Sequence, residues 1–239
     1  MFSRVKVTNG KREAVKFKLN AFERKVILNE VCHSQNYFPR ISAEQDFRIK
    51  ENDTVIDIGA HVGIFSVYAA NLARNGRVYS FEPVKKNFKR LEYHRRINNL
   101  NNITAVCKGV SDKNKNVTIF LCKKNSGGNS MYKRKFSCMN ETAGSPEIIT
   151  CITLKSIFDE YRIKRCNFLK MDCEGEEYKI LKSLPNRYFK KIEKISLEFH
   201  HPIVNELRLA KHIANRGFRV TIRDVGRPLG MIFAKRIMK

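Results

Sequence analysis

Residues 55–66 read VIDIGAHVGIFS: an apolar run, a short turn with two glycines, and a second apolar run. The glycines are Gly59 and Gly63. The β-branched run before the turn predicts a buried strand at 54–60, and the longer run after it predicts a helix at 63–76. A strand that enters a helix through a glycine-rich turn is typical of nucleotide sites in α/β proteins.

The same alternation continues along the chain. The sequence predicts a strand at 77–83, a helix at 85–100 and a third strand at 103–112. These strands are apolar almost throughout, which is typical of a parallel sheet covered by helices on both faces. We therefore predict the α/β fold class, with a mostly parallel sheet.

Further strands are predicted later in the sequence. They lie at 116–124, 166–175 and 194–201, and residues 218–236 are predicted to form a terminal antiparallel hairpin. The polar, glycine-rich stretch at 125–147 is predicted to be a loop. Its central residues suit either a lid over the site or a solvated surface loop.

The length of 239 residues, 42% of them hydrophobic, is enough for one main core. We expect a main domain at 51–239 and an N-terminal extension at 1–50 that caps the site or faces the substrate, with a helix near 21–33. No apolar run reaches the ~18 residues that span a bilayer, and the first residues lack the apolar centre of a secretory signal. A soluble, cytoplasmic protein is the expectation.

The cysteines and the charge bear on partners. Seven scattered cysteines without a C-x-x-C pair indicate reduced, packed thiols. The formal net charge is +24, from 47 Lys and Arg against 23 Asp and Glu. Such a charge favours an anionic partner such as nucleic acid. A generally lysine-rich host is the alternative, and no zinc-finger or RNA-binding aromatic motif accompanies the charge.

The turn itself differs from the dinucleotide motif G-x-G-x-x-G. His61 stands where the second glycine of that motif would let a pyrophosphate approach. Asp57, Gly59 and Gly63 give D-x-G-x-x-x-G instead, with an acid in the strand. An acid there attracts a cofactor with a cationic end and repels phosphates. The pattern therefore favours S-adenosylmethionine over a dinucleotide.

Two further acids follow the second and third predicted strands. Glu82, next to Pro83, is placed to accept hydrogen bonds from two ribose hydroxyls. Asp112 is placed to accept from an adenine amino group, with Val110 beside the ring. Either acid alone would suit an exposed surface, but acids after successive parallel strands meet at one edge of the sheet.

At this point the sequence resembles the FkbM family of S-adenosylmethionine-dependent methyltransferases. The resemblance covers roughly residues 50–200 and rests on VIDIGAHVGIFSVYAA, YSFEPVKKNFKRL, GVSD and NFLKMDCEGEEYKIL. It implies a Rossmann-like, seven-stranded methyltransferase sheet and methylation of a hydroxyl on a sugar, glycan or small metabolite. It also implies cofactor contacts from the glycine turn, a ribose contact from Glu82 and an adenine contact from Asp112.

The resemblance places the end of the fourth strand beside the methyl group. Asp172, His200 and His201 are then the candidate bases for a hydroxyl acceptor. Asp172 could instead bind loop amides or the cofactor, and the histidines could cap the next helix. No metal is expected, although Asp172, Glu174, and Glu198 or a histidine would suit Mg²⁺ or Mn²⁺. An RNA methyltransferase or a basic nucleic-acid-binding protein is the alternative function, and the sequence says nothing of the oligomeric state.

Overall fold

The computed structural model describes residues 2–6, 14–34, 36–39, 47–122, 127–132 and 145–237. None of the helices in these ranges combines the length and apolar character that a bilayer crossing requires. The cysteines in these ranges are free thiols, as predicted.

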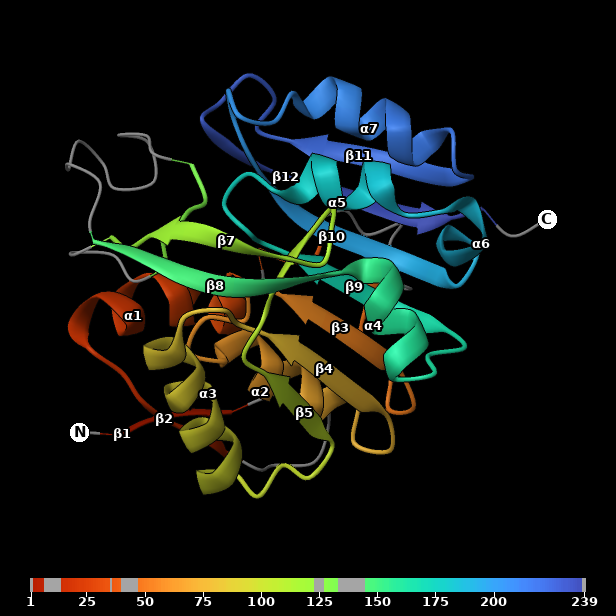
Figure 1. Ribbon diagram of the computed structural model, residues 1–239. Coiled ribbons are helices and arrows are strands. Elements are labelled where there is room, and N and C mark those ends of the chain that lie inside the picture. Colours follow the sequence, from red (N-terminus) through yellow and green to blue (C-terminus); the bar gives the residue numbers. More distant parts are fainter. Residues whose placement is uncertain are drawn as a thin grey trace.

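A seven-stranded sheet lies at the centre of the molecule (Figure 1). Across the sheet the strands are β11 (Phe218–Arg223), β12 (Leu229–Arg236), β10 (Ile192–His200), β9 (Cys166–Met171), β3 (Thr54–Ile58), β4 (Arg77–Phe81) and β5 (Ile103–Val106). The five strands from β10 to β5 run parallel, and β12 is antiparallel to both of its neighbours. The predicted mostly parallel sheet and terminal hairpin are both confirmed.

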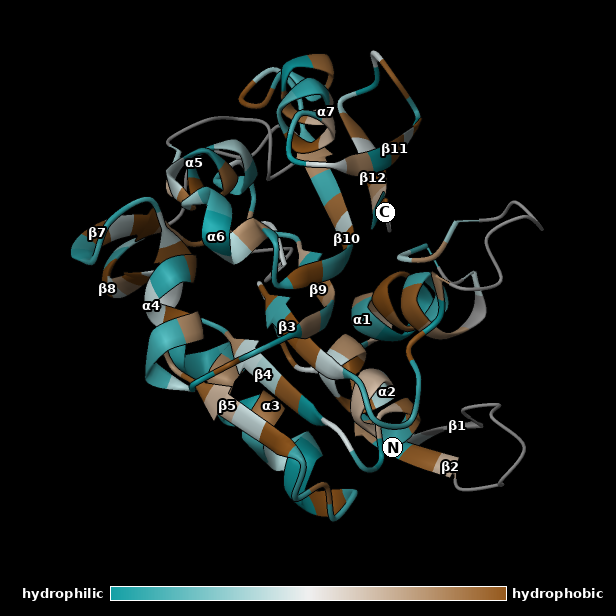
Figure 2. Ribbon diagram, turned by 90° about the vertical axis from the view of Figure 1, so that its right-hand side faces the viewer, coloured by the Kyte–Doolittle hydropathy of each residue, from teal (hydrophilic) through white to brown (hydrophobic). Residues whose placement is uncertain are grey.

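Helices cover both faces of this sheet (Figure 2). One face packs against α2 and the N-terminal segment, and the other packs against α4 to α7. The helices are α1 (Ala21–Lys25), α2 (Ile64–Leu72), α3 (Lys85–Ile97), α4 (Leu154–Glu160), α5 (Glu177–Ser183), α6 (Asn186–Phe189) and α7 (Glu206–Ala214).

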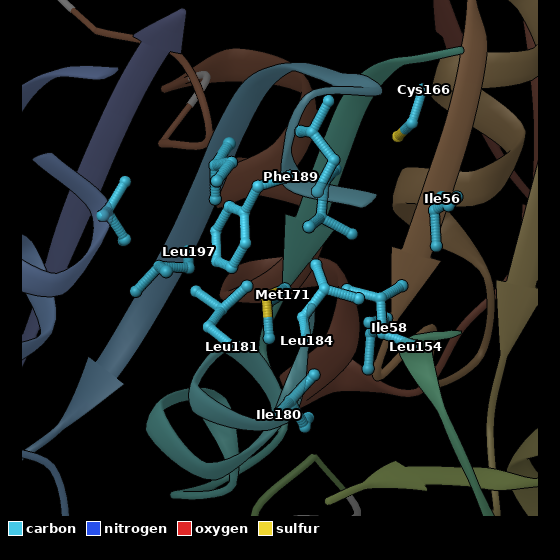
Figure 3. Packing of buried hydrophobic residues seen from close by; sticks show 14 of the residues in the cluster. Ile56, Ile58, Leu154, Cys166, Met171, Ile180, Leu181, Leu184, Phe189 and Leu197 are labelled. Atoms are coloured by element: carbon cyan, nitrogen blue, oxygen red, sulfur yellow. The ribbon is translucent and has the colours of Figure 1, made fainter. Parts of the chain in front are cut away.

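A compact apolar cluster joins β9 and β10 to α5 and α6, the two helices that lie between them in the sequence. Figure 3 shows Met171, Leu181, Leu197 and Phe189 directed toward one another, and all four are fully buried. Burying such a side chain contributes about 1.5–3 kcal/mol. The cluster therefore fixes the two strands whose carboxyl ends form one side of the cavity described below.

A second, three-stranded sheet interrupts the predicted order. It contains β6 (Gly109–Ser111), β7 (Lys115–Phe120) and β8 (Pro146–Thr153). The third strand, predicted as one piece at 103–112, is therefore wrong beyond Val106: the chain leaves the central sheet and β6 pairs with β8 instead. Each piece carries enough apolar residues to look like part of one strand, because apolar content does not identify the pairing partner.

The segment before β3 is anchored to the rest of the protein. It forms β1 (Phe2–Lys6), β2 (Ala14–Lys18), α1 and a π-helical turn, η1 (Asn29–His33), in the region of the predicted helix. Asn20 and Glu23 form a capping box at the start of α1. The buried Glu23 carboxylate also makes an ion pair with Arg90 of α3. This contact holds the N-terminal segment over the mouth of the cavity.

Candidate active site

A cavity of about 460 Å³ lies at the carboxyl ends of β3, β4, β9 and β10. Its volume falls within the range of about 300–1,000 Å³ that is usual for small-molecule sites. Its walls come from the N-terminal segment, the turn after β3, the end of β4, the second sheet and residues 127–132. Several predicted site residues line it: Gly59, His61, Glu82, Pro83, Val110, Asp172 and His200.

The turn after β3 has a left-handed backbone at three of five residues. The φ angles are 75° at Gly59, 51° at His61 and 86° at Gly63. A Cβ atom on Gly59 would lie 1.7 Å from the backbone oxygen of Asp172, and one on Gly63 would press against Leu91. Both glycines are thus required by close packing within the protein as well as by backbone conformation.

Asp57 does not reach the cavity wall, which corrects the expectation that it faces the cofactor. Its carboxylate is fully buried, accepts a hydrogen bond from Ser66 at 2.6 Å and pairs with Lys170 Nζ at 3.1 Å. Asp57 and Lys170 lie opposite each other in the register of β3 and β9. Lys170 also donates to the Gly59 carbonyl at 2.7 Å. The pair therefore fixes the turn, and only its lysine lines the cavity.

Glu82 lies at the end of β4 and lines the cavity. Its carboxylate accepts hydrogen bonds from the His61 N–H at 2.9 Å, the Val84 N–H at 3.0 Å and the Asn87 side chain at 3.3 Å. Burial raises the pKa of Glu82 to about 7, although these donors oppose the shift. The side chain is held in one orientation before any ligand binds.

The structure separates the two residues expected at the adenine. Val110 is buried in β6 and lines the cavity. Asp112 lies beyond the end of β6, outside the cavity lining, and pairs with Lys115 at 3.2 Å. Asp112 follows the second sheet rather than the central one, so it does not share the edge occupied by Glu82.

Asp172 follows β9 and faces the cavity from the opposite side. Its Oδ2 accepts a 2.8 Å hydrogen bond from the hydroxyl of Tyr37, a buried residue of the N-terminal segment. Lys170 Nζ lies 3.9 Å from the same oxygen and 5.2 Å from the centre of the Tyr37 ring. The sequence analysis missed both partners, because Tyr37 lies 135 positions away and Lys170 lies inside an apolar strand.

His200, the last residue of β10, lines the cavity and His201 does not. The Nδ1 atom of His200 lies 3.1 Å from the buried carboxylate of Glu177, and Nε2 lies 3.4 Å from Glu174 and 3.9 Å from Asp172. Burial alone would lower the pKa of His200, but the carboxylates of Glu174, Glu177 and Glu198 hold it well above its ordinary value. Burial raises the pKa of Glu174 to about 8.

His201 instead points toward α7. Its Nδ1 lies 3.4 Å from Glu206, and its side chain is 43% exposed. Successive residues of a strand face opposite sides of the sheet, so only one of the two histidines can face the cavity. The expectation of a catalytic role for His201 has no support from this geometry.

Part of the loop predicted at 125–147 closes one wall of the cavity. Ser130 donates to the Glu174 carbonyl at 2.8 Å, and Tyr132 donates to Glu176 at 2.8 Å. Asn129 accepts a hydrogen bond from the Cys122 N–H at 2.8 Å. The basic residues Lys133, Arg134 and Lys135 lie outside the described residues.

The cavity lining is acidic in a chain that is strongly basic. Among the described lining residues Lys170 is the one lysine or arginine, and it is paired with Asp57. The carboxylates of the lining are those of Glu30, Glu82, Asp172, Glu174 and Glu198. Burial raises the pKa of four of these carboxyl groups, and a cationic ligand that favours their ionised forms suits this lining better than a phosphorylated cofactor does.

Comparisons with known proteins agree with this arrangement. The profile of the family described as "Methyltransferase FkbM domain" matches residues 57–220. "Methyltransferase 1" of Beauveria bassiana is 19% identical, over 84% of this chain and 82% of its own length. "AMB antimetabolite synthetase AmbE" of Pseudomonas aeruginosa is 23% identical over 82% of this chain, which spans only 11% of that protein.

Among solved structures, "Methyltransferase FkbM" from Methylobacillus flagellatus has a similar fold. It superposes with a TM-score of 0.54 and 20% identity, covering 78% of this chain and 44% of its own. At this identity the likeness concerns the fold.

Proposed function

Because the chain belongs to the FkbM family of methyltransferases, we propose that it transfers a methyl group from S-adenosylmethionine to a hydroxyl of a sugar, glycan or small metabolite. The observation that carries this proposal is the acidic cavity between Glu82 and Asp172. S-adenosylmethionine, when bound, supplies an electrophilic methyl group on a sulfonium. A cavity rich in carboxylates, with no free lysine or arginine among its described lining residues, fits that cationic, phosphate-free molecule.

Glu82 and the turn would hold the nucleoside part of the cofactor. A carboxylate that is already fixed by three N–H donors can accept hydrogen bonds from two adjacent hydroxyls with little loss of side-chain entropy. Val110 and Pro83 supply apolar surface beside it. Asp57 takes part indirectly, because it holds Lys170 and through it the Gly59 carbonyl.

Asp172 is the proposed base for the acceptor hydroxyl. The oxygen must lose its proton as it gains the methyl group, and Asp172 Oδ1 faces the cavity while Oδ2 is held by Tyr37. His200 is the weaker base, because the neighbouring carboxylates raise its pKa and favour the protonated ring. Tyr37 and Glu30, both from the N-terminal segment, would shape the acceptor side.

The test is calorimetry with S-adenosylmethionine on the full chain. Replacing Glu82 with Gln should weaken binding by about 1–3 kcal/mol, while Glu147→Gln, at an exposed position of β8, serves as the matched control. Unchanged affinity in the Glu82 variant would reject the ribose role. Mass spectrometry of small-molecule extracts incubated with methyl-labelled cofactor would then identify the acceptor.

An RNA acceptor is the second candidate, favoured by the distribution of charge. Buried acidic residues outnumber buried lysines in the described ranges, so the exterior is richer in positive charge than the composition alone implies. The only fully buried lysines among them are Lys170 and Lys194. The buried acids are Glu23, Asp53, Asp57, Glu82, Glu176, Glu177 and Glu206.

The RNA candidate is tested by chromatography on immobilised RNA. Retention that falls steeply with salt would support it, and no retention at moderate ionic strength would contradict it.

A further inference from the structure

Three side chains with metal-binding groups converge at the acceptor end of the cavity. Asp172 and Glu174 come from the turn after β9, and His200 comes from the end of β10. One ligand atom from each lies within 4.8 Å of the others. Two carboxylates and an imidazole are a donor set that divalent cations such as Mn²⁺ and Zn²⁺ accept.

The orientation of His200 points independently to a cation. The residue is 5% exposed, and its Nδ1 faces the fully buried carboxylate of Glu177 at 3.1 Å. The same Glu177 oxygen accepts hydrogen bonds from the Cys173 N–H at 3.1 Å and the Gly175 N–H at 3.2 Å. An ionised carboxylate only accepts hydrogen bonds, so Nδ1 carries a proton.

The other ring nitrogen is therefore the one that faces the cavity. In a neutral ring, the lone pair lies on Nε2, which points toward Glu174 and Asp172. Among the described residues, the carboxylate nearest to Nε2 is that of Glu174, whose Oε2 lies 3.4 Å away. A lone pair opposite two carboxylates is repulsive unless a positive species lies between them. That species is a proton, carried either by Nε2 or by the Glu174 carboxyl group, whose pKa is raised to about 8, or it is a bound cation.

A carboxylate behind the imidazole is also how proteins hold a metal-binding histidine, since it fixes the ring and its tautomer. Here Glu177 does this for His200, and through the Cys173 and Gly175 amides it also fixes the turn that carries Glu174. Ser130 holds the Glu174 carbonyl from the other side. The three groups are thus oriented by contacts that do not depend on a ligand.

We propose that Asp172, Glu174 and His200 Nε2 bind one divalent cation, of which Mn²⁺ is the representative. Three protein ligands leave coordination positions open for water or for the acceptor hydroxyl. This role rests on the proposed function: a cation bound to that oxygen would lower the pKa of the hydroxyl and fix its position, with Asp172 acting as a ligand and the proton leaving to water instead of to Asp172. Glu198 also lines the cavity, and burial raises the pKa of its carboxyl group well above the usual range.

Titration of the full chain with Mn²⁺, followed by electron paramagnetic resonance of the free ion, tests this site. We expect one Mn²⁺ per chain, and at least tenfold weaker binding in His200→Gln and in Glu174→Gln. Glu177→Gln, which disturbs only the orientation, should weaken binding by about 10- to 100-fold. His201→Gln is the matched control, since this histidine lies outside the cavity, and should bind like the unmodified protein.

Two results would overturn the site. One is no saturable Mn²⁺ binding up to millimolar concentration by a folded protein, which would leave a proton on Nε2 or on Glu174 as the compensating species. The other is equal weakening by His201→Gln and His200→Gln, with circular dichroism unchanged in both. Calorimetry with S-adenosylmethionine in the presence of a chelator separates this proposal from the proposed function. A protein that binds the cofactor but not Mn²⁺ contradicts the metal site and leaves the proposed function standing. A protein that binds Mn²⁺ but not the cofactor contradicts the cofactor assignment and leaves the metal site standing.

Discussion

Replacing Gly59 with Ala tests whether the turn is shaped by the protein's own packing. The backbone there has a φ of 75°, and an added Cβ would lie 1.7 Å from the Asp172 oxygen and 2.8 Å from its carbonyl carbon. A Cβ atom essentially never lies within 3.0 Å of a non-bonded heavy atom, so the two strand ends must separate by about 1.3 Å (3.0 − 1.7). Gly226 is the matched control, because its φ is 73° and an added Cβ would meet nothing within 4 Å.

The left-handed backbone alone costs an alanine about 1–2 kcal/mol. Gly226→Ala should therefore lower the free energy of unfolding by that amount. Gly59→Ala should lower it by a further 2–4 kcal/mol or so, because two hydrogen-bonded strands cannot move apart without loss of packing. Urea denaturation of the three proteins measures the difference. Equal losses in the two variants, within about 0.5 kcal/mol, would refute the close-packing argument.

Three other substitutions test the residues around the cavity. Lys170→Met should destabilise the protein by about 3–5 kcal/mol because it leaves Asp57 buried without its partner; adding Asp57→Asn should recover much of the loss in urea denaturation. Cofactor affinity should rise as the pH increases through about 7, because the pKa of Glu82 is raised to about that value and only the ionised form accepts two hydroxyls; a Glu82→Gln variant that kept this dependence in calorimetry would contradict the role. Tyr37→Phe should lower kcat more than it raises the KM for cofactor, because Tyr37 orients the proposed base Asp172. The loss of kcat should not exceed the factor of about 10²–10⁴ that a general base contributes. Equal changes in both constants would place Tyr37 at the cofactor.

The central sheet could be predicted from the sequence because its strands are buried on both faces. Strands of this kind appear as apolar runs between glycines and prolines, as at 54–60 and 166–175. The second sheet could not be predicted, since its pairing of β6 with β8 joins segments separated by about forty residues. Period and composition report which residues are buried, and they carry no information on which strand lies alongside.

Within the site, the roles of single acids were harder to predict than the location. Asp57 was expected to face a cationic cofactor, and its charge is instead neutralised by Lys170 in the adjacent strand. A lysine inside the apolar run NFLKM was the available indication, because a buried charge requires a partner. Strand alternation could also have separated His200 from His201. The contribution of Tyr37 depends on a contact across the whole fold and has no local pattern.

The origin of the cavity walls has a consequence for how such enzymes diverge. Glu82 and the glycine turn follow strands of the central sheet, whereas Tyr37 and Glu30 come from the segment before it, which packs on one face of that sheet and pairs with α3 through Glu23 and Arg90. Mutations at the cavity-facing residues of this segment would reshape the proposed acceptor side without altering the strand that ends at Glu82. We therefore expect a new acceptor to require changes at these few positions, while the buried apolar residues that pack the segment on the sheet are kept.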